Sequence, residues 1–263
     1  MELSFDKEFF IEVLETVELK GKYFSSGSLK YDSLGEYVKI VPVRDSWRTG
    51  YFFMNGDNQT FVCYYAPSII EEDEASVVLE ISKLMKYLKT MSGRITLNIE
   101  ESYCVISSEP QSATIPVSLL HPNDLALSRL FSTTNDISYS NDLAPVSWGN
   151  EGTTSQFMIE NGFQMEGKRL RKIMNSCESV GHGVYTFAHS GNVLSIMSSL
   201  GNEHYAERIE GITSMGEASV TFTGPIHKAL NDGSFNVYFN TDNLILLVSG
   251  LITIVRAPYV SVD

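Results

Sequence analysis

The sequence has few of the residue types from which catalytic and metal-binding sites are usually built. Its 263 residues include only three cysteines, an odd number spread far apart, so neither a disulfide framework nor a zinc site is indicated. The five histidines show no metal-ligand spacing either. The residues concerned are Cys63, Cys104, Cys177, His121, His182, His189, His204 and His227. We therefore expect no metal site and no cofactor.

The motifs of the common enzyme classes are also missing. There is no glycine-rich dinucleotide motif or P-loop, no GxSxG nucleophile motif, no HExxH zinc motif and no EF-hand loop. The acidic run at residues 71–74 is more typical of a solvated loop than of a cation site. A protein without enzymatic activity is the leading interpretation. The alternative is an enzyme with an unrecognised acid–base site, built from His204 with Glu207 or His189.

Long hydrophobic runs are absent as well. The longest, at residues 244–255, is interrupted by Ser249 and Gly250 and is too short to span a bilayer. The first residues, MELSFDKEFF, lack the basic and apolar regions of a signal peptide. With 43% hydrophobic and 19% charged residues, the composition is that of a folded, soluble protein. We expect an intracellular protein of the cytoplasm or nucleus, virus-infected host cells included.

Positive charge is scarce, and it is concentrated in a few places. The formal net charge is −13, from 19 Lys and Arg against 32 Asp and Glu. Residues 81–91 (ISKLMKYLKTM) and 167–177 (GKRLRKIMNSC) carry seven cations and no acid, and residues 224–231 (GPIHKALN) add one cation and again no acid. An acidic protein arranged in this way is expected to hold a polyanion at one surface. No aromatic residue lies among the cations of the second segment, so contact with backbone phosphates is favoured over base stacking.

Both basic segments have the periodicity of amphipathic helices. Their apolar residues recur at i, i+3, i+4 and i+7, and the cations lie on the other side. A third helix is expected after the N-cap residue Asp6, and a short fourth one at 224–231. An ordinary solvated helix face is the alternative to an anion-binding face. The candidate anion-binding residues are Lys83, Lys86, Lys89, Lys168, Arg169, Arg171, Lys172 and Lys228.

Most of the remaining chain is predicted to form short antiparallel strands. Residues 96–107, 184–196 and 235–255 each contain two apolar runs joined by a turn. A segment rich in Ser, Asn, Asp, Pro and Gly separates two copies of the order helix, strands, helix, strands. We predict an α+β fold with two similar β-rich domains, residues 1–118 and 155–263, joined by a connector at 119–154. Each domain carries two helices, and we expect the same helical position to be basic in both copies.

Four segments together resemble a DNA sliding clamp of the proliferating-cell-nuclear-antigen (PCNA) family. Residues 27–38 (GSLKYDSLGEYV) resemble its first-domain strand and aspartate-serine turn, and residues 79–96 its helix and following strand. Residues 191–202 (GNVLSIMSSLGN) resemble a second-domain strand ending in Gly-Asn. Residues 235–260 resemble the terminal hairpin, whose Ala-Pro signature is here Ala257-Pro258. The resemblance covers nearly the whole chain as a pattern, not as high identity.

The resemblance implies a clamp fold in which the two domains of each subunit supply four helices to the inner face of a ring. Three subunits close around duplex DNA as a homotrimer, touch phosphates without reading sequence, and tether a DNA polymerase. A separate ATPase, the clamp loader, loads the ring, which has no activity of its own. Alternatives are a clamp-like subunit of a heteromeric or non-ring complex, of checkpoint or viral transcription type, and an unrelated β-sandwich binding protein.

The resemblance also implies two protein-binding surfaces. Subunits join through edge strands at about 111–118 and 193–200, and partner peptides dock beside the connector and the C-terminal tail. Packing of the connector on its own domain is the alternative for its apolar residues. The implied interface residues are Ala113, Ile115, Val117, Val193, Ser195 and Met197. The implied peptide-binding residues are Tyr31, Leu125, Leu127, Leu130, Phe131, Val255, Ala257 and Pro258.

Some features depart from the family pattern. The first helix carries Glu8, Glu12 and Glu15, the fourth is short, and Asn243 stands in place of a proline before the last strand. The acidic tail after Ala-Pro is also short. These departures are typical of a divergent clamp, with a virus or an archaeon as alternative sources.

Overall fold

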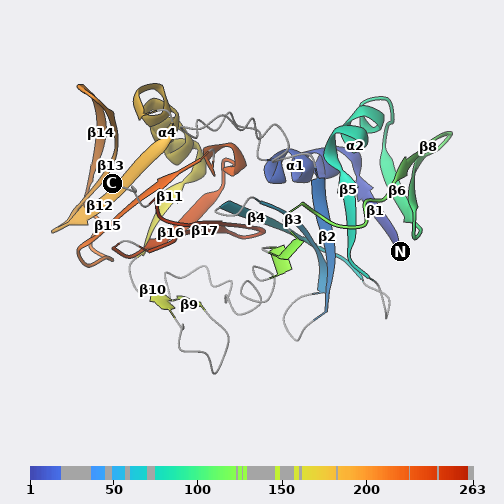
Figure 1. The fold of residues 1–263 in the computed structure, drawn as a ribbon, viewed down its shortest axis with the longest axis horizontal. Coiled ribbons are helices and arrows are strands. Elements are labelled where there is room, and N and C mark those ends of the chain that lie inside the picture. Colours follow the sequence, from blue (N-terminus) through green and yellow to red (C-terminus); the bar gives the residue numbers. More distant parts are fainter. Residues whose placement is uncertain are drawn as a thin grey trace.

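Antiparallel strands make up most of the chain and form one eight-stranded sheet with a four-stranded sheet at each end (Figure 1). The computed structural model describes residues 1–18, 37–44, 49–56, 60–69, 75–122, 124–125, 127–128, 146–148, 157–159, 162–181, 183–224, 226–241 and 243–259. For residues 146–148 and 157–159 it describes only the backbone. These two segments pair as β9 (Val146–Trp148) and β10 (Phe157–Ile159).

The first half of the chain opens with a strand and a helix, continues with four strands and a second helix, and ends with three strands. β1, β6, β7 and β8 form one terminal sheet, and β5, β2, β3 and β4 form half of the central sheet. The elements are β1 (Glu2–Asp6), α1 (Lys7–Val17), β2 (Tyr37–Arg44), β3 (Thr49–Gly56), β4 (Thr60–Pro67), β5 (Val77–Glu80), α2 (Ile81–Leu88), β6 (Arg94–Ile99), β7 (Tyr103–Ser108) and β8 (Gln111–Pro116).

The second half repeats this order. β15, β12, β13 and β14 form the other terminal sheet, and β11, β16, β17 and β18 complete the central one. The elements are β11 (Gly162–Glu166), α4 (Gly167–Gly181), β12 (Val184–Ser190), β13 (Val193–Leu200), β14 (Glu203–Glu210), β15 (Ala218–Thr223), the 3-10 helix η1 (Ile226–Ala229), β16 (Ser234–Phe239), β17 (Ile245–Ser249) and β18 (Ile252–Arg256).

The two halves also share strand register. In both, the last residue before the first helix faces the first residue of a partner strand, and the first helical residue donates its backbone N–H to a glycine carbonyl oxygen. In the first half Asp6 lies opposite Arg94, and Lys7 N donates to Gly93 O at 3.2 Å. In the second half Glu166 lies opposite Ser234, and Gly167 N donates to Gly233 O at 2.7 Å. By this correspondence α4 is the counterpart of α1, and η1 is the counterpart of α2.

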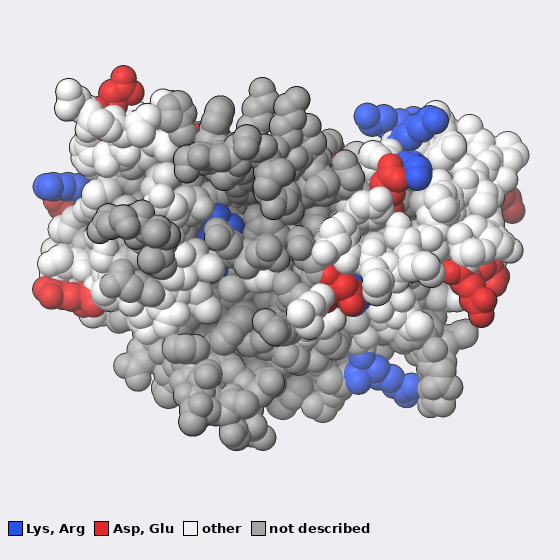
Figure 2. Space-filling model, viewed as in Figure 1, with Lys and Arg blue, Asp and Glu red and all other residues white. Residues whose placement is uncertain are grey.

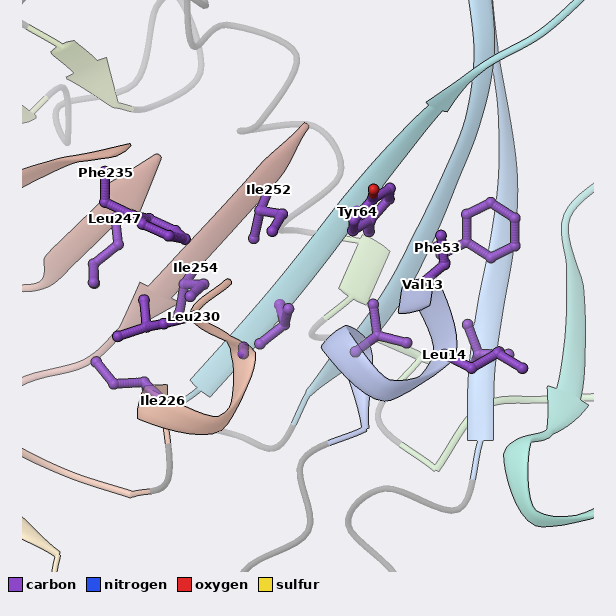
Figure 3. Packing of buried hydrophobic residues seen from close by; sticks show 14 of the residues in the cluster. Val13, Leu14, Phe53, Tyr64, Ile226, Leu230, Phe235, Leu247, Ile252 and Ile254 are labelled. Carbon is purple, nitrogen blue, oxygen red and sulfur yellow. The ribbon is translucent and has the colours of Figure 1, made fainter. Parts of the chain in front are cut away.

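The halves join where β18 pairs with β4, with Ile254 opposite Val62. Both side chains are fully buried, and α1 and η1 pack against β4 and β18 at this join; Figure 3 shows Val13 and Leu14 of α1 on one side of it and Ile226 of η1 on the other. One hydrophobic core therefore runs through both halves. Each fully buried large apolar side chain in it contributes about 1.5–3 kcal/mol.

The other face of the central sheet carries a second, smaller hydrophobic cluster. Successive side chains of a strand point to opposite faces, so Phe53 joins the main core while Phe52 and Met54 join this cluster. Leu127, in the segment that connects the halves, is fully buried in the second cluster. The central strands are thus covered on both faces.

The helices form where the sequence predicts them, with one exception. The Asp6 carboxylate accepts hydrogen bonds from the backbone N–H groups of Glu8 and Phe9, at 3.0 and 3.3 Å, which caps α1 as expected. The helix predicted at 224–231 is only the 3-10 turn η1. Gly224 before it has a φ of 106°, and the Asn231 side chain accepts a hydrogen bond from Gly233 N after it, so both ends favour a turn. Within the described residues no helix is long and apolar enough to cross a membrane.

Candidate nucleic-acid interface

The helix α2 turns its lysines away from the core. Ile81, Leu84 and Leu88 are buried, whereas Lys86 and Lys89 are exposed. Figure 2 shows basic side chains gathered at the upper right, over α2. Lys89 follows the last turn of the helix, where the helix dipole favours a cation.

The third lysine of α2 is already paired. Lys83 Nζ lies 2.6 Å from the Glu80 carboxylate, and this hydrogen bond is the main reason why the pKa of Glu80 is lowered. Lys86 lies over the Tyr87 ring at 5.4 Å from its centroid. Neither Lys86 nor Lys89 has a carboxylate partner in the part of the chain that the structure describes.

The helix α4 presents a polar stripe to solvent. Lys168, Lys172, Asn175 and Ser179 are exposed and recur at helical spacing, opposite the buried Leu170, Ile173, Met174 and Cys177. With Arg171 and Ser176 they line an open depression of roughly 590 Å³. The ammonium groups and the Asn175 amide can donate hydrogen bonds to phosphate oxygens, whereas Ser176 and Ser179 donate their hydroxyl protons to carbonyl oxygens of the helix itself. This α4 stripe, residues 168, 172, 175 and 179, is therefore a candidate anion-binding surface.

The two arginines of α4 are held by neighbouring elements. Arg171 forms an ion pair with Asp232 and donates a hydrogen bond to the Leu230 carbonyl oxygen at 2.6 Å. Arg169 lies 3.8 Å from the Glu207 carboxylate on β14. The free positive charge of α4 therefore comes from Lys168 and Lys172, which have no carboxylate partner in the described ranges.

The counterpart of this stripe on α1 has the opposite charge. Because α1 and α4 begin at Lys7 and Gly167, Glu8 corresponds to Lys168, Glu12 to Lys172 and Glu15 to Asn175. All three glutamates are exposed. The expectation that the same helical position is basic in both halves is therefore wrong: the second helix of the first half and the first helix of the second half are the basic ones.

The four helices form a row along one side of the central sheet, in the order α2, α1, η1, α4. Neighbours in this row contact one another, and Figure 1 shows α2, α1 and α4 along the upper side. Charge along the row is positive at α2, negative at α1, weakly positive at η1 through the exposed Lys228, and positive at α4. A long polyanion lying along the row would meet cations at its two ends.

Each terminal sheet leaves one strand edge that faces away from the join. These edges are β8 in the first half and β14 in the second, the counterparts of the joined strands β18 and β4. Ala113, Ile115 and Val117 lie on or just after β8, in agreement with an edge position. The assignment of 193–200 to an edge is wrong, because that segment is β13, which pairs with both β12 and β14. Val193, Ser195 and Met197 are half-buried on this inner strand.

The connector is anchored to the first half close to its start. Asp124 accepts a hydrogen bond from Lys39 Nζ on β2 at 2.5 Å. His121 is buried, and its Nε2 lies 3.2 Å from both the Tyr37 carbonyl oxygen and Asn55 Oδ1. These contacts hold the start of the connector against β2 and β3.

The residues expected to bind partner peptides do not form one exposed surface. Leu127 and Val255 are buried together in the second cluster, which agrees with packing of the connector on its own fold. Leu125 is 68% exposed, and Ala257 and Pro258 are half-buried. Tyr31, Leu130 and Phe131 lie outside the described residues.

The cysteines lie in the interior of the fold. The three cysteines are buried and form no disulfide. Burial raises the pKa of Cys104 to about 12 and that of Cys177 to about 11, so both remain thiols at neutral pH. The described residues also contain no cluster of His, Cys, Asp and Glu able to hold a metal ion.

Comparisons with known proteins identify solved structures that share this fold. No protein-family model matches the sequence, and no curated protein matches it at a significant level. A putative DNA polymerase III β subunit from Eubacterium rectale matches 100% of the chain with a TM-score of 0.68 and 14% identity. The subunit β from Borrelia burgdorferi, in complex with a natural product, matches 100% of it with a TM-score of 0.71 and 9% identity. The chain spans about two thirds of these proteins, 66% and 65%.

A third solved structure has nearly the same length. It is PCNA from A. fulgidus with the C-terminal region of FEN-1 bound, and it matches 100% of this chain and 99% of its own, with a TM-score of 0.67 and 11% identity. The chain therefore has the sliding-clamp fold, mixed α+β and rich in strands, as expected from the sequence.

Proposed function

We propose that this chain is the subunit of a sliding clamp, a ring that encircles duplex DNA and tethers replication proteins without chemistry of its own. The observation that carries the proposal is the pair of edge strands β8 and β14, each of which pairs on one side only among the described strands, on a duplicated clamp fold whose helices lie in one row. The length match to PCNA favours two clamp domains per subunit, residues 1–118 and 155–263 with the connector at 119–154. Three such subunits then give a closed homotrimer.

The internal join indicates how copies would pair. At that join Ile254 of β18 lies opposite Val62 of β4. Ala113 is the counterpart of Ile254. Ala113 lies opposite Ile106 and Ile254 lies opposite Leu247, and both of these partners are buried residues of the preceding strand.

Tyr205 is the counterpart of Val62 for the same reason. Tyr205 lies opposite Ser198 and Val62 lies opposite Asn55, and both of these partners are buried polar residues of the preceding strand. Both Ala113 and Tyr205 are only partly buried at the margin of the main core. Pairing β8 of one copy with β14 of the next would place Ala113 against Tyr205 and cover both.

The inner surface of such a ring would be the helix row. Lys83, Lys86, Lys89, Lys168, Arg169, Arg171, Lys172 and Lys228 are then the residues nearest the phosphates. Contact would be independent of base sequence, because lysine contacts with phosphates carry no sequence information. The negative remainder of the surface would keep DNA from binding elsewhere. Partner peptides, a polymerase and an ATP-dependent loader would engage the other faces.

The test is the size and shape of the purified chain. Sedimentation and negative-stain images at about 50 to 500 mM salt, with and without duplex DNA, should show a ring of about three times the 29.3 kDa chain mass in at least one condition. A monomer at tens of micromolar in every condition would refute the ring. In a primer-extension assay, replacing Lys83, Lys86, Lys168, Arg171 and Lys172 with Ala should abolish the gain in processivity. Unchanged processivity would remove these residues from the DNA path.

A further inference from the structure

The two basic helices of one chain lie at opposite ends of the helix row. Within the row, α1 and η1 separate α2 from α4. The exposed face of α1 carries Glu8, Glu12 and Glu15, so a polyanion bound to α2 is repelled before it reaches α4 of the same chain. Each basic helix instead lies beside a free edge: α2 contacts β8, and α4 contacts β14.

The internal join provides a template for what happens at these edges. There η1 packs on β18, α1 packs on β4, and the two helices contact each other. The counterparts of these four elements are α2, β8, α4 and β14. If copies pair through β8 and β14, α2 of one copy meets α4 of the next.

We propose that α2 of one copy and α4 of the next form a single phosphate-binding site that exists only at the junction between copies, and that assembly is therefore coupled to polyanion binding. The proposal rests on the ring described above and deepens it. It divides the inner wall into basic sectors at the junctions and an acidic sector in the middle of each subunit.

Some of the positive side chains that would meet at the junction already form ion pairs within their own chain, and others do not. Lys83, Arg169 and Arg171 already have carboxylate partners on their own chain. Lys86 and Lys89 from one copy and Lys168 and Lys172 from the next do not, in the part of the chain that the structure describes. β8 carries no charge, so it offers no carboxylate to these lysines. β14 carries Glu203, Glu207, Arg208 and Glu210, of which Glu207 is already shared with Arg169.

Like charges meeting at a junction oppose its formation. The repulsion is screened over about 10 Å at 0.1 M salt and is relieved by any polyanion that binds both helices. At the internal join the pattern is reversed, because the acidic α1 meets η1 with Lys228, and opposite charges attract. Salt and duplex DNA should therefore both promote assembly, whereas salt weakens contacts made of ordinary ion pairs.

The first experiment measures the mass of the full chain by sedimentation against salt and against a blunt 30-base-pair duplex. We expect the concentration for half-assembly to fall roughly tenfold or more from about 50 to 500 mM salt, and to fall similarly at low salt on addition of DNA. The variant Lys168→Ala/Lys172→Ala should assemble better than the original chain at low salt without DNA and yet bind DNA roughly tenfold or more weakly. The matched control Lys7→Ala, a lysine on α1, should change neither property.

The second experiment tests whether the site is shared between copies. One variant lacks the α2 lysines (Lys86→Ala/Lys89→Ala) and the other lacks the α4 lysines (Lys168→Ala/Lys172→Ala). Each alone gives rings in which every junction is half-formed. A mixed ring contains one junction in which an intact α2 meets an intact α4. An equimolar mixture, dissociated and reassembled, should therefore bind duplex DNA roughly tenfold more tightly than either variant alone.

The outcomes separate this inference from the ring proposal. Rings whose assembly is strongest at low salt without DNA, or mixed rings that bind DNA as the average of the two variants, would overturn the shared site and leave the ring in place. A chain that stays monomeric in every condition would overturn both.

Discussion

Two buried histidines, His227 and His121, are expected to make the fold sensitive to acid. His227 on η1 is 4% exposed, with Nδ1 3.2 Å from the Tyr185 hydroxyl and Nε2 3.0 Å from the Glu178 carboxylate of α4. Burial lowers the pKa of His227 and outweighs the opposing effect of Glu178, while Lys228 lowers it further. Burial also lowers the pKa of His121 at the start of the connector. Both side chains are therefore neutral in the folded protein at neutral pH.

A fall in stability with acid follows from these two residues. Between the lowered folded pKa values and the usual value near 6.5, the unfolded chain binds more protons than the folded one, so stability rises with pH through that window and falls as the pH drops through it. We expect the melting temperature to decrease from pH 7.5 to pH 5.5. The variant His227→Gln should show a shallower decrease than the original chain, and the exposed His204→Gln should show the same decrease. Equal slopes for all three would mean that other groups dominate the acid response.

Gly167, the first residue of α4, lies close to the backbone of the second half. A Cβ atom added there would lie 2.1 Å from the Asn231 carbonyl oxygen and 2.8 Å from the Phe235 ring. Since backbone atoms cannot move aside cheaply, we expect Gly167→Ala to lower the free energy of unfolding by about 1–3 kcal/mol in urea titrations. Ser179→Ala, on the exposed side of the same helix, should change it by less than about 0.5 kcal/mol. A Gly167→Ala variant as stable as the original chain would contradict the close approach.

At the scale of the elements, α1 and α4 show how one helix position takes two roles. Both bury the same face, with Phe10 of α1 and Leu170 of α4 in corresponding places, but they carry opposite charges on the face turned to solvent. Packing fixes the position of each helix, while its exposed stripe is free to carry either sign of charge. The acidic stripe of α1 is thus a property of the surface that the fold does not require.

Reversing the charge of α1 tests its place in the row. We expect Glu8→Lys/Glu12→Lys to raise DNA affinity and to steepen the dependence of log affinity on log salt by about 2, because two further lysines would meet phosphates. Fluorescence anisotropy with a labelled duplex at several salt concentrations measures both quantities. The neutral variant Glu8→Gln/Glu12→Gln controls for lost acidity and should raise affinity with a smaller change of slope. If the lysine variant did not bind DNA more tightly than the original chain, α1 would not lie near the DNA.

Local signals in the sequence predict the main elements well. The cap at Asp6, the apolar periodicity of α2 and α4, and the strand pairs within 96–107 and 184–196 are all confirmed. These predictions succeed because each depends on residues a few positions apart. The failures depend on distant contacts. The strand at 193–200 has an alternating pattern whether it lies inside a sheet or at its edge, and only its pairing with both β12 and β14 decides the matter.

The candidate site was predictable in part. Counting charge identifies the lysines of α2 and α4, but it does not distinguish Lys168 and Lys172 from Arg169 and Arg171, which are paired with acids distant in sequence. It also misses Asn175 and Ser179, which extend the α4 stripe without charge. Their spacing from Lys172 along one helix face is the signal that identifies them. The opposite charges of α1 and α4 become visible only when the two helices are recognised as counterparts.

At the scale of the whole molecule, the duplication explains both the strand edges that pair within the chain and those that remain at its ends. The join of β18 with β4 uses one pair of edges, and the same duplication leaves β8 and β14 as an equivalent pair. These two edges lie at opposite ends of the molecule, so they cannot pair with each other within one copy (Figure 1). A contact that joins two different surfaces in this way generates a ring or an open chain of copies. The close correspondence of register between the halves favours a junction between copies with the same geometry as the internal join.

That geometry makes the junction testable at single positions. If β8 pairs with β14 as β18 pairs with β4, Ala113 faces Tyr205 and Gln111 faces Glu207 of the next copy. We expect Ala113→Arg to place a charge against the apolar core of the junction and to raise the concentration for half-assembly by roughly tenfold or more, measured by sedimentation with duplex DNA present. Gln111→Arg, the same new side chain two residues away, should assemble as well as the original chain or better, because it would face a carboxylate. Equal effects at the two positions would show that copies meet in another register or through other strands.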